Sequence, residues 1–278
     1  MRSREQWSAL GFATPSVLGL GLFTLFPVGM AVVMSFFDWP MLGGSSFIGL
    51  ENFRYLFGED PAFLSALRNT FVFTGLYVPL NIVLALALAF WISRSRWQNL
   101  WRVLFFIPAI TPMVANAVIW KLLFQMVGTE PNLLADGRTA LVSVVAMSVW
   151  QGFGYNLIVF SAAINEMSPS VLEAASLDGA TGLRRLVSVQ LPLISPALFF
   201  ATTMTVINSL QVFTQPYILT AGGPGNATET LVMTVYQAGF QSRELGLAAA
   251  GAWVLFAIIL LVTAAQFLGQ RRWVHYES

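Results

Sequence analysis

The sequence predicts an all-α, polytopic membrane protein with about six transmembrane helices. Three observations support this: an oily composition, long apolar runs, and an uneven distribution of cations between the loops. Of 278 residues, 56% are hydrophobic and 10% are charged, and the mean hydropathy is +0.71. Soluble domains carry about 25% charged residues, so most of this chain is expected to lie in lipid.

Six apolar runs account for the composition, and each has the roughly 20 residues that a helix needs to cross a bilayer. The runs cover residues 9–37, 71–92, 103–127, 140–164, 193–221 and 245–268. None alternates between polar and apolar residues as a membrane β-strand does, so helices are expected. The first run exceeds the roughly 7–15 apolar residues of a signal peptide, and we expect it to remain as an anchor.

The loops between the runs differ in positive charge. Nine arginines fall on one side, namely Arg2, Arg4, Arg94, Arg96, Arg102, Arg184, Arg185, Arg271 and Arg272. The other side holds only Arg54, Arg68, Arg138 and Arg243. Positive loops stay in the cytoplasm, so both termini are expected there. Lys121 lies inside the third run, where two roles fit: a solute contact, or a side chain that extends to the interface.

The composition also excludes several kinds of chemistry. The chain has no cysteine, and its single histidine, His275, lies in the C-terminal tail. We therefore expect no metal site and no nucleophilic Ser/His or Cys/His pair. The net charge of +1 comes without a basic face, which argues against nucleic acid as a partner. No phosphate-binding Gly-x-x-x-x-Gly-Lys-Ser/Thr sequence occurs.

The segment between the fourth and fifth runs has the signals of a short helix on the cytoplasmic side. Ser168 and Pro169 suit a helix start, and Gly179 suits its end. A second short helix is expected from Gly182 to Leu191, with a break at Pro192. Such a segment is either a docking element for another protein or an ordinary interfacial loop, and spacing alone does not separate the two.

This segment resembles the EAA loop of permease subunits in bacterial binding-protein-dependent ABC importers. The resemblance is carried by Glu173-Ala-Ala175, Gly179 and Leu191-Pro192. Three other stretches are similar to the carbohydrate branch of that family, which includes maltose and glycerol-phosphate permeases: Leu67-Arg-Asn-Thr70, Phe105-Phe-Ile-Pro108 and Leu219-Thr-Ala-Gly-Gly-Pro-Gly-Asn-Ala-Thr228. The resemblance covers roughly residues 10–270.

The resemblance implies a type I ABC importer permease fold and a set of partners. A coupling helix at about residues 169–180 would sit in a cleft of a cytoplasmic ATPase, with Glu173 facing a basic group. The residues assigned to this coupling are Glu173, Ala174, Ala175, Asp178 and Gly179. The implied partners are a second homologous permease, two ATPase subunits, an extracytoplasmic solute-binding protein, a sugar-like solute and membrane lipid.

This chain itself is expected to be non-catalytic and to need no cofactor, since ATP and magnesium would bind the partner ATPase. The expected organisation is a cytoplasmic N-terminus at 1–8, a six-span permease domain at 9–270 and a cytoplasmic tail at 271–278. The coupling loop covers 166–192. The expected location is the bacterial inner membrane.

Polar side chains inside the spans indicate the solute pathway, because an unpaired amide in hydrocarbon is costly and usually faces a partner helix or a wet cavity. Neutral amides among aromatic rings suit a sugar. The candidates are Asn208, Gln211, Gln215, Trp150, Gln151, Tyr155, Asn116 and Trp120. Helix packing is the other role open to them. Gly222, Gly223 and Pro224 are expected to shape an external turn that touches the binding protein.

Two other classes of membrane protein fit the sequence less well, namely secondary transporters and intramembrane enzymes. A secondary transporter would need a residue to carry the coupling ion or proton, and the spans contain no Asp or Glu. An intramembrane enzyme would need paired carboxylates, a histidine pair or metal ligands, and the spans lack these as well. A permease for an amino acid or phosphate also stays open within the importer class.

Overall fold

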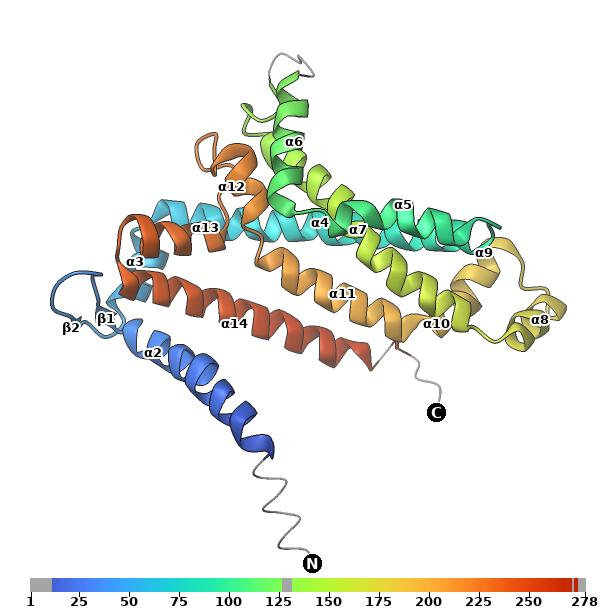
Figure 1. The fold of residues 1–278 in the computed structure, drawn as a ribbon, viewed down its shortest axis with the longest axis horizontal. Helices are drawn as coiled ribbons and strands as arrows, with labels where there is room; N and C mark the ends of the chain where they lie inside the picture. The colour runs from blue at the N-terminus through green and yellow to red at the C-terminus, as the bar shows by residue number, and fades with distance from the viewer. Residues whose placement is uncertain (1–11, 127–131, 272, 275–278) are drawn as a thin grey trace, which may run out of the picture. The chain divides into compact units, whose positions relative to one another are not determined.

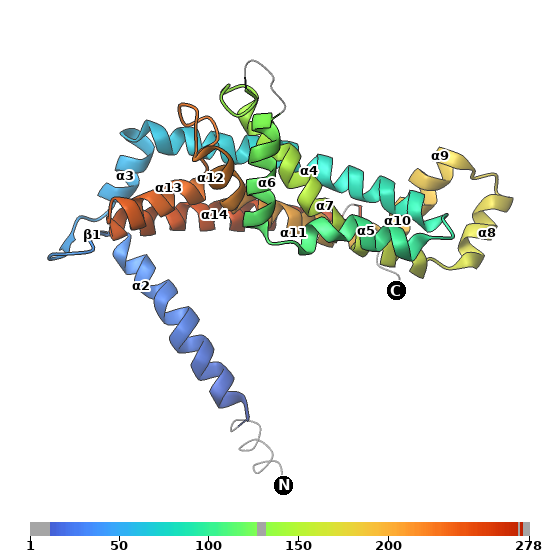
Figure 2. The ribbon, with the colours of Figure 1, turned by 45° about the horizontal axis from the view of Figure 1, so that its top comes forward.

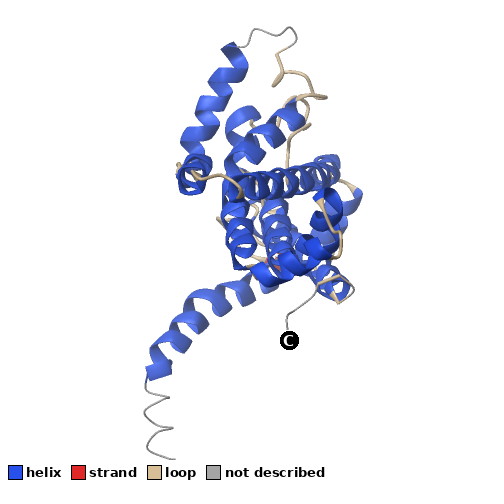
Figure 3. Ribbon diagram, turned by 90° about the vertical axis from the view of Figure 1, so that its right-hand side faces the viewer, coloured by secondary structure: helices blue, strands red, loops and turns tan. Residues whose placement is uncertain are grey.

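The computed structural model of this chain describes residues 12–126, 132–271, 273 and 274. Helices make up nearly all of this part, as Figure 3 shows, with one pair of short strands. The expected N-terminal tail, with Arg2 and Arg4, lies outside the described residues, as do residues 9–11 of the first apolar run and, in the C-terminal tail, Arg272 and residues 275–278 with His275.

The chain divides into two compact units, each described here by itself. The first comprises residues 1–61 and 234–256. Its elements are a helix from Phe12 to Met34, with the π-helical stretch η1 (Gly21–Leu25) and α2 (Phe26–Met34), then β1 (Phe37–Asp38), β2 (Ser46–Phe47), α3 (Glu51–Gly58), η3 (Gln237–Gln241) and the start of α14 (Leu245–Gln270).

A small antiparallel hairpin organises the first unit. Strands β1 and β2 pair Phe37 with Phe47, and the amide of Asn52 on α3 donates to the backbone carbonyls of Ser35 and Phe37 at 3.0 and 2.9 Å. A Cβ at Gly246 would collide with the carbonyl oxygen of Phe37. Glycine therefore allows the start of α14 to lie directly against the hairpin.

The second unit comprises residues 62–233 and 257–278. Its helices are α4 (Pro61–Ser93), α5 (Gln98–Ile110), α6 (Met113–Met126), α7 (Ala140–Glu166), α8 (Pro169–Leu177), α9 (Gly182–Arg185), the π-helical η2 (Leu186–Gln190), α10 (Leu191–Leu193), α11 (Ser195–Leu210), α12 (Thr214–Thr220), the first half of the short helix α13 (Leu231–Tyr236) and the end of α14. Figures 1 and 2 show α7 and α11 running alongside each other, and α7 crosses α4, with which it is in contact at Gly152.

Helix α7 carries the core of the second unit. Phe153, Leu157 and Phe160 on α7 are buried against small residues of α4, including Ala85 and Ala89. Nearer its start, Val144, Val145 and Met147 of α7 pack with Phe73 and other buried residues in a second cluster. Five polar residues of α7 are buried in this packing as well, namely Ser143, Ser148, Gln151, Asn156 and Ser161.

In the part of the chain that the structure describes, four helices are long and apolar enough to cross a membrane: Phe12–Met34, α4, α7 and α14. Two bent pairs raise the number to six when each counts as one span. The pair of α5 and α6 is bent by 91°, and the pair of Gly182–Leu193 and α11 by 74°. The expected all-α membrane fold with about six spans is confirmed, although the third and fifth runs are broken helices. In Figure 1, α6 turns sharply away from α5.

Prolines cause these breaks, and polar side chains satisfy the carbonyls that the prolines free. A proline cannot donate to the carbonyl four residues earlier. The carbonyl of Pro108, four residues before Pro112, accepts instead from the Asn116 amide at 3.2 Å. The carbonyl of Pro192, four before Pro196, accepts from the Ser195 hydroxyl at 2.7 Å.

The fifth run breaks a second time, between α11 and α12. Here Pro216 leaves the carbonyl of Val212 without its helical partner, and the hydroxyl of Thr230 donates to it at 2.8 Å. Irregular backbone within a membrane needs such internal partners. The break redirects the chain, so that residues 211–215 leave the line of α11.

Candidate solute cavity and coupling segment

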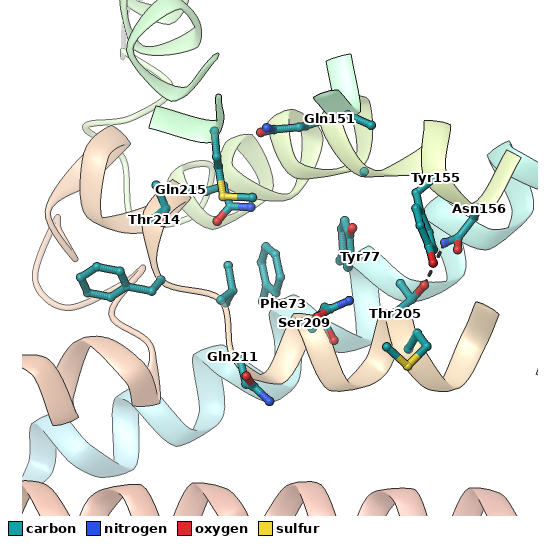
Figure 4. Close-up of a pocket in the computed structure, with 17 residues that line it drawn as sticks. Phe73, Tyr77, Gln151, Tyr155, Asn156, Thr205, Ser209, Gln211, Thr214 and Gln215 are labelled. Carbon is teal, nitrogen blue, oxygen red and sulfur yellow. Dashed lines mark hydrogen bonds between the residues drawn. The ribbon is translucent and has the colours of Figure 1, made fainter. Parts of the chain in front are cut away.

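A cavity of about 490 Å³ lies in the second unit, where α4, α7, α11 and the start of α12 meet (Figure 4). Its polar lining consists of amides and hydroxyls, from Gln151, Asn156, Asn208, Gln211, Gln215, Tyr77, Tyr155, Thr205, Ser209 and Thr214. Among the described residues, its lining includes no Asp, Glu, Lys, Arg or His. The cavity therefore offers neutral hydrogen-bonding groups beside aromatic rings.

The helix geometry explains which predicted residues gather here. Gln151 and Tyr155 are four residues apart, so they project from one face of α7. Helix α11 ends at Leu210, which leaves Gln211 at the break and brings Gln215 back toward the cavity on α12. The structure thus places Gln151, Tyr155, Asn208, Gln211 and Gln215 around one cavity.

Three other predicted pathway residues lie elsewhere. The amide of Asn116 is buried and bonded to the carbonyl of Pro108, as described above. The rings of Trp120 and Trp150 pack edge to face, with centroids 5.5 Å apart. None of the three lines the cavity, and their part in a solute pathway stays a prediction.

Asn156 joins three helices next to the cavity. Its amide nitrogen donates to Oδ1 of Asn81 on α4 at 2.7 Å and to the hydroxyl of Thr205 on α11 at 2.8 Å. Asn81 in turn donates to the hydroxyl of Tyr77 at 3.2 Å. Because both amide hydrogens of Asn156 are committed, the orientation of its side chain is fixed.

Gly152 permits the close contact that this network needs. A Cβ at this position would collide with the hydroxyl of Tyr77 and lie 3.0 Å from the amide nitrogen of Asn81. Helix α7 therefore approaches α4 closely only because residue 152 lacks a side chain. The hydrogen bonds among Tyr77, Asn81, Asn156 and Thr205 therefore require glycine at position 152.

Two acceptors beside the cavity have no partner among the described residues. They are Oε1 of Gln151 and Oδ1 of Asn156, and both atoms are buried. Gln151 is 5% exposed and Asn156 3% exposed. A buried acceptor without a partner costs free energy, which a donor on a bound molecule recovers. The cavity therefore favours a ligand that brings hydroxyl groups.

Sequence reasoning missed Tyr77, Asn81 and Thr205 as members of this site. The signal for Asn81 was present, since it is the only amide between residues 71 and 92. An amide in the middle of an apolar span usually has a partner in another helix. Which helix supplies that partner is a tertiary fact that one span does not reveal.

The predicted coupling segment, residues 166–192, contains α8, followed by a turn and the short elements α9, η2 and α10. Ser168 precedes the helix in an extended conformation, and Pro169 occupies its first turn, as expected. The Ser168 hydroxyl bonds to the Ser170 hydroxyl at 2.7 Å rather than to a backbone N–H. Gly179 ends α8 with φ +77°, a left-handed conformation that favours glycine.

The exposed surface of α8 carries the residues that resemble the EAA motif. Glu173, Ala174, Asp178 and Gly179 are exposed, and Ala175 is half-buried. Leu177 is 89% exposed. The helix after the turn reaches Leu193, two residues beyond the predicted end. The π-helical turn at Leu186–Gln190 precedes Pro192, and the chain bends at Ile194 instead.

Lys121 has a partner that neither sequence interpretation named. Its ammonium group donates to the backbone carbonyl of Ile218 at 2.9 Å. Ile218 lies in the last turn of α12, where carbonyls lack helical partners and favour a cation. Lys121 therefore fixes the end of α12 to α6.

The loop after α12 is held in one shape by α4. The amide of Asn69 donates to the carbonyls of Asn226 and Glu229 at 2.7 and 3.0 Å. The hydroxyl of Thr70 accepts from the backbone N–H of Leu231 at 3.0 Å. Two stretches that resemble the carbohydrate branch, 67–70 and 219–228, therefore contact each other. Gly222 is buried, whereas Gly223 and Pro224 are half-buried.

Helices broken at prolines, around a cavity of neutral polar groups, define a polytopic membrane transport protein. Residues 81–275 match the family model described as binding-protein-dependent transport system inner membrane component. The chain belongs to this family of inner membrane permease components. Among the described residues, no three His, Cys, Asp or Glu side chains gather as metal ligands would.

Similar proteins cover nearly the whole chain. The probable ABC transporter permease protein YesP of Bacillus subtilis is 32% identical over 291 residues, 99% of this chain and 94% of that protein. The sn-glycerol-3-phosphate transport system permease protein UgpA of Agrobacterium fabrum is 34% identical, with 94% of each chain covered. The probable starch degradation products transport system permease protein AmyD of Thermoanaerobacterium thermosulfurigenes is 30% identical, over 94% of this chain and 93% of that protein.

Two solved structures share the fold. One is a bacterial ABC transporter that imports the acidic polysaccharide alginate, with a TM-score of 0.80 and 20% sequence identity over 97% of this chain and 96% of that chain. The other is the alginate transporter in complex with a pentasaccharide-bound periplasmic protein, with a TM-score of 0.78, 20% identity and the same coverage. The predicted ABC importer permease fold is confirmed.

Proposed function

We propose that this chain is the permease subunit of an ATP-driven importer for an uncharged sugar or sugar-like solute. The observation that carries the proposal is the cavity between α4, α7, α11 and α12. It has neutral amides, aromatic rings and two buried acceptors without partners. Sugar hydroxyls donate to such acceptors, while the C–H face of a sugar packs on aromatic rings.

The lack of a charged group in the cavity lining argues for an uncharged solute. Proteins bind phosphate and carboxylate groups most strongly through arginine and lysine side chains. The relative UgpA is named for sn-glycerol-3-phosphate and the alginate transporter for an acidic polysaccharide. This chain shares their family or fold, but its lining supplies no cation for such anions. The relative AmyD is named for starch degradation products, and neutral solutes of that kind would suit this lining better.

We propose that α8 is the coupling helix and that ATP and magnesium bind to a partner ATPase. This chain has no phosphate-binding loop, and it leaves Glu173 exposed on α8 beside small residues. The carboxylate would face a cation of the ATPase, while Ala174 and Ala175 let that protein approach. Closure of two such ATPase subunits would move α8 and shift the pore between inward-open and outward-open states.

The other proposed partners are a second, homologous permease and a solute-binding protein on the outer side. The turn at Gly222–Pro224 would touch the binding protein. The hydrogen bonds from Asn69 to Asn226 and Glu229, further along the same loop, support a preformed surface. Both termini would lie in the cytoplasm, in keeping with the excess of arginine on that side. Asp178 and Gly179 complete the proposed coupling surface.

The test is ATP hydrolysis by the complete complex, reconstituted with its binding protein and offered a panel of solutes. The panel contains neutral mono- and oligosaccharides together with matched anionic forms such as a sugar phosphate and a uronic acid. We expect a neutral sugar to stimulate hydrolysis and its anionic counterpart to have no effect. Stimulation by anionic members alone would contradict the proposal of an uncharged solute.

A further inference from the structure

A second recess in the same unit, a groove of about 770 Å³, lies beside the end of α4 and the segment that follows α8. One wall is the last part of α4, with Val83, Leu86, Ala87, Phe90 and Trp91. The other wall comes from α9, η2 and α10, through Gly182, Leu183, Leu186 and Leu191. It shares no lining residue with the solute cavity.

The walls of this groove are apolar and open. Val83 is 65% exposed, Trp91 52% and Leu183 74%. On a soluble protein such a surface would mark a site of association, and in a bilayer it contacts acyl chains. The groove is therefore suited to an apolar chain rather than to water.

Its length matches one leaflet of a bilayer. From Val83 to the end of α4 at Ser93 is ten residues, or about 15 Å at 1.5 Å per residue. A leaflet is half of a hydrocarbon core of about 30 Å. Along α4, the residues that line the groove begin at Val83.

The far end of the groove is polar and positive. Arg94 and Ser95 complete its lining, and Arg94 is exposed. No acceptor for the Arg94 guanidinium is present among the described residues. Arg96 differs, because its guanidinium lies 5.4 Å from the ring centre of Trp97 and outside the groove. In the proposed membrane orientation, an arginine at this end of an apolar groove would lie among the headgroups, where it complements a lipid phosphate.

We propose that this groove binds an anionic phospholipid of the cytoplasmic leaflet. One acyl chain lies along α4 between Val83 and Trp91, and the headgroup contacts Arg94 and Ser95. The groove joins α4 to the segment that leads from α8 into α11, so the lipid connects a span to the coupling segment. This inference rests on the proposed membrane orientation and not on the identity of the solute.

Native mass spectrometry of the full-length protein tests the proposal with two probes. They are 1-palmitoyl-2-oleoyl phosphatidylglycerol and the phosphatidylcholine with the same acyl chains, which isolate the effect of headgroup charge. We expect the wild-type protein to retain phosphatidylglycerol preferentially. Arg94→Gln should lower the ratio of the two retained lipids about fivefold, since one arginine near the surface is worth about 1 kcal/mol. Arg96→Gln, two residues away, is the matched control and should leave the ratio unchanged.

A second variant tests the apolar part. Ala87→Trp places a large ring in the groove and should reduce the retention of both lipids, whereas Leu76→Trp, on an exposed part of α4 outside the groove, should not. Equal losses from Arg94→Gln and Arg96→Gln would overturn the proposal, because diffuse attraction predicts that result. Unchanged retention in both groove variants would overturn it as well, as would a protein helix found in the groove of the assembled complex.

Discussion

The solute cavity and the coupling segment belong to the same unit, yet their side chains are held in opposite ways. In the cavity, Asn156 bonds to Asn81 and Thr205, which are 75 and 49 positions away in the sequence. In the coupling segment, the side-chain hydrogen bonds that the structure shows join residues no more than nine positions apart. Glu173, at the centre of that segment, is exposed.

This difference indicates which part of each region is left for a ligand. Beside the cavity, Asn156 joins α7 to α4 and α11, and the buried acceptors of Gln151 and Asn156 are left for a small molecule. The coupling helix is held by its own ends, with Pro169 at its start and Gly179 at its close, and leaves its whole outer surface for another protein. Substitutions in the cavity should therefore alter helix packing and solute binding. Substitutions on the surface of α8 should alter only the binding of the partner protein.

The largest effect is expected from Glu173→Lys. Reversing this charge should abolish ATP-dependent uptake, because it places a cation against the proposed cation of the ATPase. The loss of a paired charge at a protein interface costs about 2 kcal/mol or more, or about thirtyfold in affinity. Co-purification of the ATPase measures the loss directly.

The matched control for this change is Glu59→Lys, at an exposed site outside the coupling segment. It should insert into the membrane as well as Glu173→Lys does and should retain the ATPase. Normal uptake by Glu173→Lys would remove the main support for a docking role of α8.

Gly152→Ala should have the next largest effect, on stability. Its Cβ would strike Tyr77 and Asn81, and overpacking of this kind costs about 1–3 kcal/mol. The midpoint of thermal unfolding in detergent should fall for this variant. It should not fall for Gly75→Ala on α4, where a Cβ meets nothing within 4 Å. Equal midpoints for the two variants would show that the helices do not meet at Gly152.

Asn69→Asp should have a smaller effect, which is confined to the loop after α12. The carboxylate cannot donate to the carbonyls of Asn226 and Glu229, so two hydrogen bonds are lost, for about 1–2 kcal/mol. Hydrogen exchange of the backbone amides in residues 222–231 should become faster, while exchange in α8 stays the same. Unchanged exchange in the loop would mean that Asn69 does not hold it.

The smallest effect is expected from Gln151→Leu. It removes a buried acceptor that has no protein partner, so stability should change little. The half-saturating concentration for stimulation by the transported solute should rise about fivefold, the equivalent of one hydrogen bond of about 1 kcal/mol. A drop in stability without any change in solute response would assign Gln151 to packing instead.

The same contrast explains how much of the molecule the sequence predicts. The coupling helix follows from local signals, since Pro169 and Gly179 mark its ends within a dozen residues. The six apolar runs follow from hydropathy. Pro112 and Pro216 predict breaks in the helices. The carbonyls that these prolines free are bonded by Asn116 and Thr230, and Thr230 comes from the loop before α13, 18 positions after Val212.

The cavity was predictable only in part. Helical spacing correctly groups Gln151 with Tyr155, and the stripe of Asn208, Gln211 and Gln215 reaches the same cavity. Asn116, Trp120 and Trp150 have the same chemical character, yet they pack away from it. Side-chain type shows that a residue in lipid needs a partner, but not whether that partner is a helix or a solute.

The central claim is that a separate ATPase moves this chain through the α8 coupling segment. Solute uptake into proteoliposomes that contain the complete complex tests it most directly. Uptake should continue in the presence of a protonophore and stop when internal ATP is removed. Uptake by this chain alone, driven by an ion gradient without ATP, would contradict the account.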